Sequence, residues 1–121
     1  MPTSWAFTRQ HRLLTGTQYQ TVFDHTEWKV GNAVFLLLAR KNQQPQPRLG
    51  LVIGRKRAKR AVDRACIKRR AREQFRLRQQ KLAGLDVILL VRGRIDHPDP
   101  SDVSDQLGRL FDKLLAKCGQ A

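Results

Sequence analysis

The sequence predicts an α+β fold, an α/β sandwich in which helices pack on a small mixed β-sheet in the order αββαβα. Residues 85–92 contain a continuous apolar run from Val87 to Val91, which indicates a strand covered on both faces, and the helical segment 57–82 before it indicates a strand–helix–strand unit. The chain has 121 residues, 40% of them hydrophobic, which is enough for one core. We therefore expect residues 1–121 to form a single domain.

The first predicted element is a short helix that follows an extended lead at residues 1–14. Thr15 or Thr17 can cap this helix, and Tyr19, Val22 and Phe23 then lie on one face at helical spacing. We expect the helix to end near His25.

Two strand segments follow. Residues 29–40 contain an apolar run between Gly31-Asn32 and a loop with two prolines, which favours a β region that can hold one strand or two. Residues 48–54 form the next predicted strand. The polar loop at residues 41–47 is typical of a turn, so we expect these two segments to pair as a hairpin.

The second half of the chain predicts a long helix, a strand and a last helix. Residues 57–82 contain no Gly or Pro and end just before Gly84, which suits a C-terminal cap. Asp99 and Pro100 stand where an N-cap and a first-turn proline belong. Apolar residues at intervals of three and four after Pro100 then indicate an amphipathic helix packed on the sheet.

Positive charge is concentrated in the predicted long helix and the residues before it. The net charge is +14, with a pI near 11.3. Residues 55–81 hold thirteen Lys and Arg against Asp63 and Glu73, which leaves +11 in that segment alone. A local excess of this kind favours a surface that docks a polyanion. No apolar run reaches the ~18 residues of a membrane span, so we expect a cytoplasmic protein with no membrane partner.

Five cations of the long helix are spaced by four residues. Each advances 40° around the helix, so together they form a slowly winding stripe. Neighbouring pairs repel by ~0.2–0.5 kcal/mol each, a cost that bound phosphates would offset. A solvated helix face is the alternative. The stripe consists of Arg60, Arg64, Lys68, Arg72 and Arg76.

The other side of this helix is expected to pack against the protein. Ile67, Ala71 and Phe75 form one apolar ladder, and Ala58, Val62 and Cys66 form a second. The aromatic rings of Tyr19, Phe23 and Phe35 could stack on unpaired bases, although aromatics at such spacing are more often core residues.

The sequence does not support a protein active site. His11, His25 and His97 lie in different segments without a nucleophile or a paired carboxylate. Helix capping and turns account for the acidic residues around His97 better than a metal site does. Cys66 and Cys118 have neither zinc-site nor disulfide-framework spacing. We therefore predict no catalytic residue, no metal site and no organic cofactor in the protein itself.

Four segments of the chain resemble the protein subunit of bacterial ribonuclease P. They are AFTRQHRLLT at residues 6–15, RLGLVIGRK at 48–56, AVDRACIKRRARE at 61–73 and the FR pair that ends at Arg76. The family's helix normally reads Arg-Asn-Arg-x-Lys-Arg. Arg64, Lys68 and Arg69 match that pattern, whereas Ala65 and Cys66 replace the asparagine and the second arginine.

The resemblance implies a fold of the ribosomal protein S5 domain 2-like type, with a left-handed βαβ crossover. It also implies an endoribonuclease in which the protein binds a catalytic RNA and helps it to remove the 5′ leader of precursor tRNA. Magnesium ions held mainly by that RNA would perform the hydrolysis. The cationic helix would face the catalytic RNA, and a cleft between the first helix and the sheet would receive the single-stranded leader.

The residues that we expect to contact RNA come from the stripe and from the family pattern, to which Arg55 and Lys56 also belong. In the cleft, Tyr19 and Phe23 match family positions, and Phe35 is added because its ring could stack on a base. The predicted RNA-binding residues are Arg55, Lys56, Arg60, Arg64, Lys68, Arg69, Arg72 and Arg76.

Two other functions remain open from the residues. A ribosomal or general RNA-binding protein could use the same helix, and a DNA-binding protein is a weaker alternative because no helix-turn-helix frames the basic segment. Nothing in the sequence predicts a protein oligomer.

Overall fold

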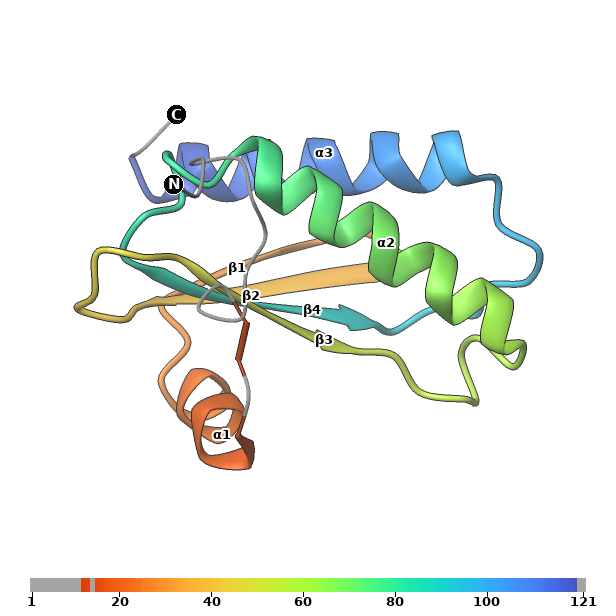
Figure 1. The fold of residues 1–121 in the computed structure, drawn as a ribbon, viewed down its shortest axis with the longest axis horizontal. Coiled ribbons are helices and arrows are strands. Elements are labelled where there is room, and N and C mark those ends of the chain that lie inside the picture. The colour runs from red at the N-terminus through yellow and green to blue at the C-terminus, as the bar shows by residue number, and fades with distance from the viewer. Residues whose placement is uncertain (1–11, 14, 120–121) are drawn as a thin grey trace, which may run out of the picture.

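The computed structural model describes residues 12–13 and 15–119, in which three helices surround one four-stranded sheet (Figure 1). The predicted order is confirmed, and the first β region holds two strands. The elements are α1 (Gly16–Asp24), β1 (Trp28–Gly31), β2 (Phe35–Lys41), β3 (Arg48–Val52), α2 (Ala61–Leu77), β4 (Leu85–Val91) and α3 (Pro100–Lys117). Of the predicted extended lead at residues 1–14, residues 1–11 and 14 lie outside the described part.

The strand order in the sheet is β1-β2-β4-β3, so the predicted hairpin between residues 29–40 and 48–54 is wrong. β4 lies between β2 and β3, antiparallel to the first and parallel to the second. The apolar β4 is buried almost throughout and forms two ladders in the sheet centre, a position that the more polar β3 could not fill as well. β3, α2 and β4 form the predicted strand–helix–strand unit.

The two faces of the sheet are covered differently. α2 and α3 pack side by side on one face, and α1 lies against the other (Figure 1). Alternation along β2 separates the two cores, because Phe35, Leu37 and Ala39 belong to the α2/α3 side. Leu38 joins Val22 of α1 in the smaller cluster on the opposite face. Among the described residues, one short helix covers this face of the sheet, whereas two long helices cover the other.

Both helix N-caps that the sequence predicts are present. Thr15 caps α1 in a capping box, in which its hydroxyl accepts from the Gln18 amide at 3.2 Å and the Gln18 side chain accepts from the Thr15 amide at 3.2 Å. Asp99 caps α3 by accepting from the Ser101 amide at 3.1 Å, with proline in the first turn. The sequence therefore predicts the starts of α1 and α3 correctly.

α2 is shorter than the predicted helix at residues 57–82. Residues 55–57 form a turn after β3, in which the amide of Arg57 donates to the Gly54 carbonyl at 3.1 Å, and extended Arg60 is the N-cap. After Leu77 the chain continues in turns that bring Leu82 fully into the core. Gly84, expected to cap the helix, instead ends these turns with a φ of +82°, a conformation that glycine adopts without strain.

Candidate RNA interface

α2 is anchored by one buried ladder of side chains. Ile67, Ala71 and Phe75 are fully buried, as predicted, and the Phe75 ring meets the Phe111 ring of α3 edge-on at 6.5 Å between centroids. The second predicted ladder does not form on the helix: Ala58 is fully buried but lies before α2, Cys66 is only partly buried, and Val62 is 58% exposed. Burial on a single ladder leaves most of the circumference of α2 open to a partner.

The first two cations of the predicted stripe have intramolecular partners. Arg60 Nε lies 3.9 Å from the buried carboxylate of Asp63. Nη1 of Arg64 donates to the carbonyls of Ala58 and Lys59 at 2.9 and 2.8 Å, which ties the end of the β3–α2 connection to the helix. Both residues can still meet RNA, but Arg64 also supports local structure.

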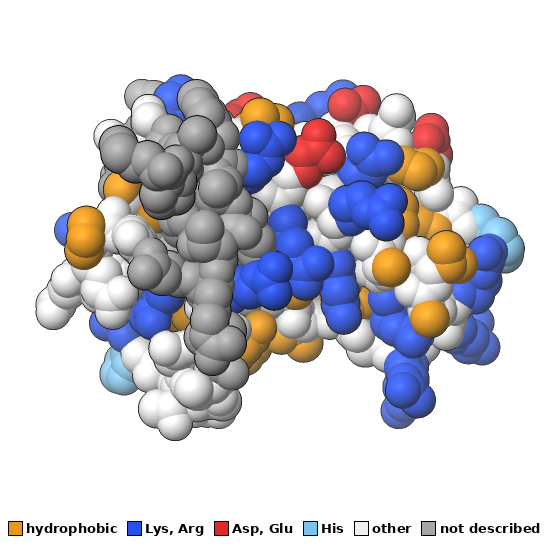
Figure 2. Space-filling model, viewed as in Figure 1, with side chains coloured by type: hydrophobic (Ala, Val, Ile, Leu, Met, Phe, Trp, Pro, Cys, Tyr) orange, Lys and Arg blue, Asp and Glu red, His pale blue; other side chains and the backbone are white. Residues whose placement is uncertain are grey.

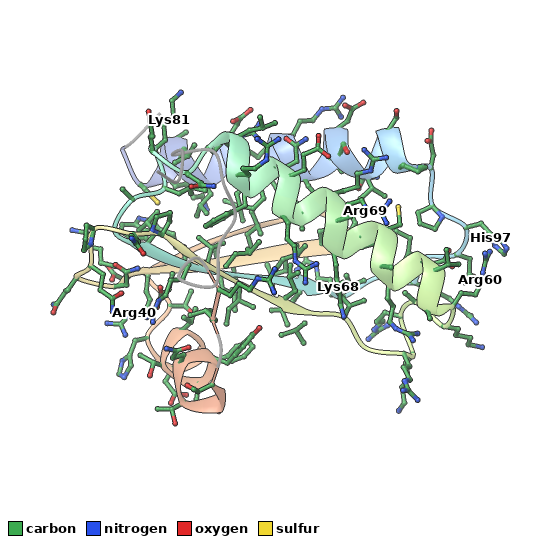
Figure 3. All side chains as sticks on the ribbon, in the orientation of Figure 1. Arg40, Arg60, Lys68, Arg69, Lys81 and His97 are labelled. Atoms are coloured by element: carbon green, nitrogen blue, oxygen red, sulfur yellow. The ribbon has the colours of Figure 1, made fainter. Side chains whose placement is uncertain are left out.

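Lys68 and Arg72 lie further along the stripe and converge on a pocket of about 310 Å³ between α2, β3 and α1. None of the described residues that line this pocket is acidic. We call it the cationic pocket; its lining residues are Arg12, Leu13, Tyr19, Leu49, Leu51, Lys68 and Arg72. Figure 3 shows Lys68 projecting from α2 toward β3.

The charges in the cationic pocket are mutually unfavourable in the free protein. Burial lowers the pKa of the Arg72 guanidinium, and the neighbouring Arg12 lowers it further. A lowered pKa of a basic group means that its charged form is disfavoured where it stands. A bound phosphate would reverse both effects, since it supplies a counter-charge and accepts guanidinium hydrogen bonds.

Tyr19 closes the cationic pocket from the α1 side. Its hydroxyl accepts from the Leu51 amide at 3.2 Å, which fixes the ring on the edge strand β3. Gly50 makes this contact possible, because a Cβ there would stand 2.6 Å from the ring. Tyr19 is therefore held between the sheet and the cations of α2, where its ring can contact a bound nucleotide.

The remaining predicted RNA-contacting cations lie outside the pocket. Arg55 and Lys56 are exposed in the connection before α2, Arg69 is exposed on α2, and Arg76 is partly exposed in its last turn. In Figure 2, Lys and Arg side chains gather along the face that carries α2. The structure thus brings Lys68 and Arg72 together and spreads the other cations along the same face.

The predicted leader cleft divides into the cationic pocket and a second hollow. Phe23, 40% exposed, lines a groove of about 480 Å³ between the end of α1 and strands β1 and β2. We call this the apolar groove; its lining residues are Phe23, Thr26, Glu27, Trp28, Lys29, Leu36 and Leu38. Tyr19 and Phe23 lie on the same helix but line different hollows.

The prediction that Phe35 lines the cleft is wrong. Its side chain is fully buried on the α2/α3 side of the sheet. Leu36 and Leu38, the neighbours that alternation places on the opposite face, line the groove instead. The period-two pattern of β2 was the signal that could have found them. Arg12 was also missed; it is the first residue that the structure describes and forms an isolated parallel β-bridge with Leu49.

The described residues offer no cluster for metal binding. In residues 12–13 and 15–119, no group of three or more His, Cys, Asp or Glu could hold a metal ion. Asp102 accepts from the Gln106 side chain at 2.8 Å, and Asp99 caps α3. His11 lies outside the described residues. The described helices include none that is long and apolar enough to cross a membrane.

Comparison with known proteins identifies the family. Residues 7–115 match the family model described as Ribonuclease P. The chain belongs to the ribonuclease P protein family. A ribonuclease P protein component from Alcanivorax borkumensis is 74% identical over 121 residues, with both chains fully covered. One from Idiomarina loihiensis is 41% identical and covers 99% of this chain and 96% of its own.

Solved structures of ribonuclease P proteins have the same fold. The protein from Staphylococcus aureus superposes with a TM-score of 0.76 at 22% identity, covering 85% of this chain and 94% of that one. The protein from Thermotoga maritima gives 0.70 at 27% identity, covering 87% and 96%. Ribonuclease P is the ribonucleoprotein that removes the 5′ leader of precursor tRNA, so the chain is the protein part of an endoribonuclease complex and has an RNA partner.

Proposed function

We propose that this protein binds the catalytic RNA of ribonuclease P through α2 and the cationic pocket, and the precursor tRNA leader along the α1 face of the sheet. The convergence of Arg12, Lys68 and Arg72 on a pocket without acidic lining carries the proposal. Arginine forks and a lysine ammonium are the groups that grip phosphates, and their cost in the free protein is offset by RNA.

Phosphodiester hydrolysis belongs to the RNA in this proposal. Magnesium ions held mainly by that RNA would supply the hydrolytic chemistry, and the protein contributes charge and positioning. We place the complex in the cytoplasm, where precursor tRNA is made.

Reconstitution with a bacterial ribonuclease P RNA tests the proposal. The wild-type protein is expected to raise precursor cleavage at low magnesium, and the double variant Lys68→Ala/Arg72→Ala to lose most of that gain. The matched control is Arg109→Ala/Lys113→Ala, which removes two exposed cations from α3. Loss of two phosphate contacts should flatten the slope of log affinity against log salt by about 1.4–1.8.

Two results would contradict the proposal. One is a wild-type protein that gives no gain in cleavage at low magnesium with any bacterial ribonuclease P RNA. The other is equal loss of RNA affinity in the two double variants, which would show that total charge matters and the cationic pocket does not.

A further inference from the structure

Arg40 stands at the end of the floor of the apolar groove. Leu36, Leu38 and Arg40 alternate along β2, so all three side chains point to the α1 face of the sheet. Leu36 and Leu38 line the groove, and Arg40 is the next residue on that face. Figure 3 shows Arg40 on the α1 side of the sheet.

The acid opposite Arg40 is already paired with another arginine. Asp86 of β4 is the register partner of both Arg40 and Arg48 and is almost fully buried. Arg48 grips this carboxylate with Nε at 2.7 Å and Nη2 at 2.6 Å, and the Asn42 amide donates to it at 2.9 Å. This bidentate geometry assigns Asp86 to Arg48 and leaves little acceptor capacity for Arg40.

Arg40 has no acceptor within the described residues. Its Nε is buried without a hydrogen bond, and no carboxylate among residues 12–13 and 15–119 forms an ion pair with it. Glu27, the acid that lines the groove, accepts from the Lys41 amide at 3.0 Å. Arg48, Asp86 and Arg40 form a row across β3, β4 and β2, in which the carboxylate is paired with Arg48 alone. This row keeps a net charge of +1 that is partly withdrawn from water.

We propose that Arg40 binds a phosphate of single-stranded RNA whose neighbouring base lies in the apolar groove. A cation next to an aromatic and aliphatic hollow matches the alternation of phosphate and base along one strand. Phe23 and Leu38 supply the apolar surface for the base. On the opposite side of Leu38, its register partner Lys29 offers an exposed ammonium for the next phosphate.

This inference rests on the proposed function, since it takes the RNA in the groove to be the precursor leader. It adds a phosphate-binding residue on β2, on the far side of the sheet from α2. Within residues 12–13 and 15–119, folding gives the side chain of Arg40 no hydrogen bond, which favours a role in ligand binding over a role in stability. Replacing Arg40 should thus separate RNA binding from stability.

The experiment compares Arg40→Met, Arg40→Lys and the control Lys41→Met in the reconstituted holoenzyme. Lys41 is exposed and lies on the opposite face of β2, so the control removes the same charge one residue away. Arg40→Met is expected to weaken the affinity for precursor with a long leader about tenfold, as expected for one charge-assisted hydrogen bond. Arg40→Lys should retain part of the wild-type affinity for this precursor, and Lys41→Met should retain nearly all of that affinity.

Three further readouts test the assignment to the leader. Affinity for a precursor with a single-nucleotide leader should be equal in wild type and Arg40→Met. The affinity of the protein for the catalytic RNA should not change. The melting temperature of free Arg40→Met should equal or exceed that of wild type, because the buried Nε without an acceptor is gone.

The inference is overturned if Arg40→Met melts lower and binds both precursors as wild type does, since Arg40 would then be structural. Equal losses for Arg40→Met and Lys41→Met would overturn it too, because they would indicate only a general charge effect. Failure of the proposed function looks different: the wild-type holoenzyme itself would not distinguish long from short leaders.

Discussion

Arg64 and Arg72 occupy equivalent places in the predicted stripe, two turns apart on α2, but their surroundings differ. Arg64 donates to two backbone carbonyls of the β3–α2 connection, at 2.9 and 2.8 Å. Arg72 lines the cationic pocket, where burial and Arg12 lower its pKa. The same four-residue spacing therefore includes Arg64, which stabilises the fold, and Arg72, whose charge is unfavourable in the free protein.

Alanine at these two positions should consequently have opposite effects on the free protein. Arg64→Ala is expected to lower the free energy of unfolding by about 1–2 kcal/mol, because two charge-assisted hydrogen bonds are lost. Arg72→Ala should leave it unchanged or raise it, because a desolvated and repelled cation is removed. Urea denaturation measures both. Titration with the catalytic RNA should show the salt slope of Arg72→Ala flattened by about one phosphate contact.

The prediction fails at Arg72 if its alanine variant keeps the full salt slope. It fails at Arg64 if urea denaturation finds no loss of stability. Arg69→Ala is the control, since Arg69 is exposed on the same helix and should affect stability little.

For single residues, the sequence predicts the chemical character of a side chain better than it predicts which face of the fold that side chain points to. The cationic character of α2, the caps Thr15 and Asp99, and the buried Ile67 ladder all follow from local spacing. Phe35 does not, because which face of a strand is covered depends on elements far along the chain. The pairing of Asp86 with Arg48 in preference to Arg40 is likewise set by the sheet, which aligns residues 38 positions apart.

At the scale of elements, the first half of α2 departs from the family pattern on an open surface. Ala65 is exposed and Cys66 partly exposed, and Val62 beside them is 58% exposed. Ala65 and Cys66 stand where the family normally has an asparagine and an arginine. Nothing in the structure explains the two departures.

Restoring the family residues should strengthen RNA binding. Ala65→Asn/Cys66→Arg adds a cation to a helix that already carries Arg69, at one exposed and one partly exposed position. We expect about three- to tenfold tighter binding of the catalytic RNA at moderate salt, with a salt slope steeper by about 0.7–0.9. Cys66→Ser, which changes the thiol without adding charge, is the matched control. Unchanged affinity would mean that RNA does not reach this turn of α2.

The predicted hairpin is wrong because it assumes that segments adjacent in the sequence are also adjacent in the sheet. Each strand was found close to its position, but the insertion of β4 between β2 and β3 is a long-range choice. It is decided by which strand best tolerates burial on both faces, and only the assembled sheet makes that comparison. Similarly, the end of α2 at Leu77 depends on the burial of Leu82, a tertiary contact that overrides helix propensity.

Across the whole molecule, charge is divided between two surfaces. Cations occupy α2, its preceding connection and the row on the α1 face, whereas exposed acids such as Asp102, Asp105 and Asp112 belong to α3. Among the described residues, ion pairs such as Arg78–Asp112, at 2.8 Å, join the helices on the α3 side. The free protein thus carries most of its +14 charge on the faces proposed to meet RNA.

Salt should therefore act in opposite directions on the free protein and on its complex. Raising KCl from about 0.05 M to about 0.5 M screens the self-repulsion of the cationic faces and should raise the melting temperature of the free protein by about 3–6 °C. The same change should weaken RNA binding by orders of magnitude, because fewer counterions are released. Scanning calorimetry and filter binding, with sorbitol at matched osmolarity as the control, measure the two effects. A melting temperature that falls with KCl would show that attractive pairs such as Arg48–Asp86 outweigh the repulsion along α2, and the cost assigned to the cationic stripe would then be wrong.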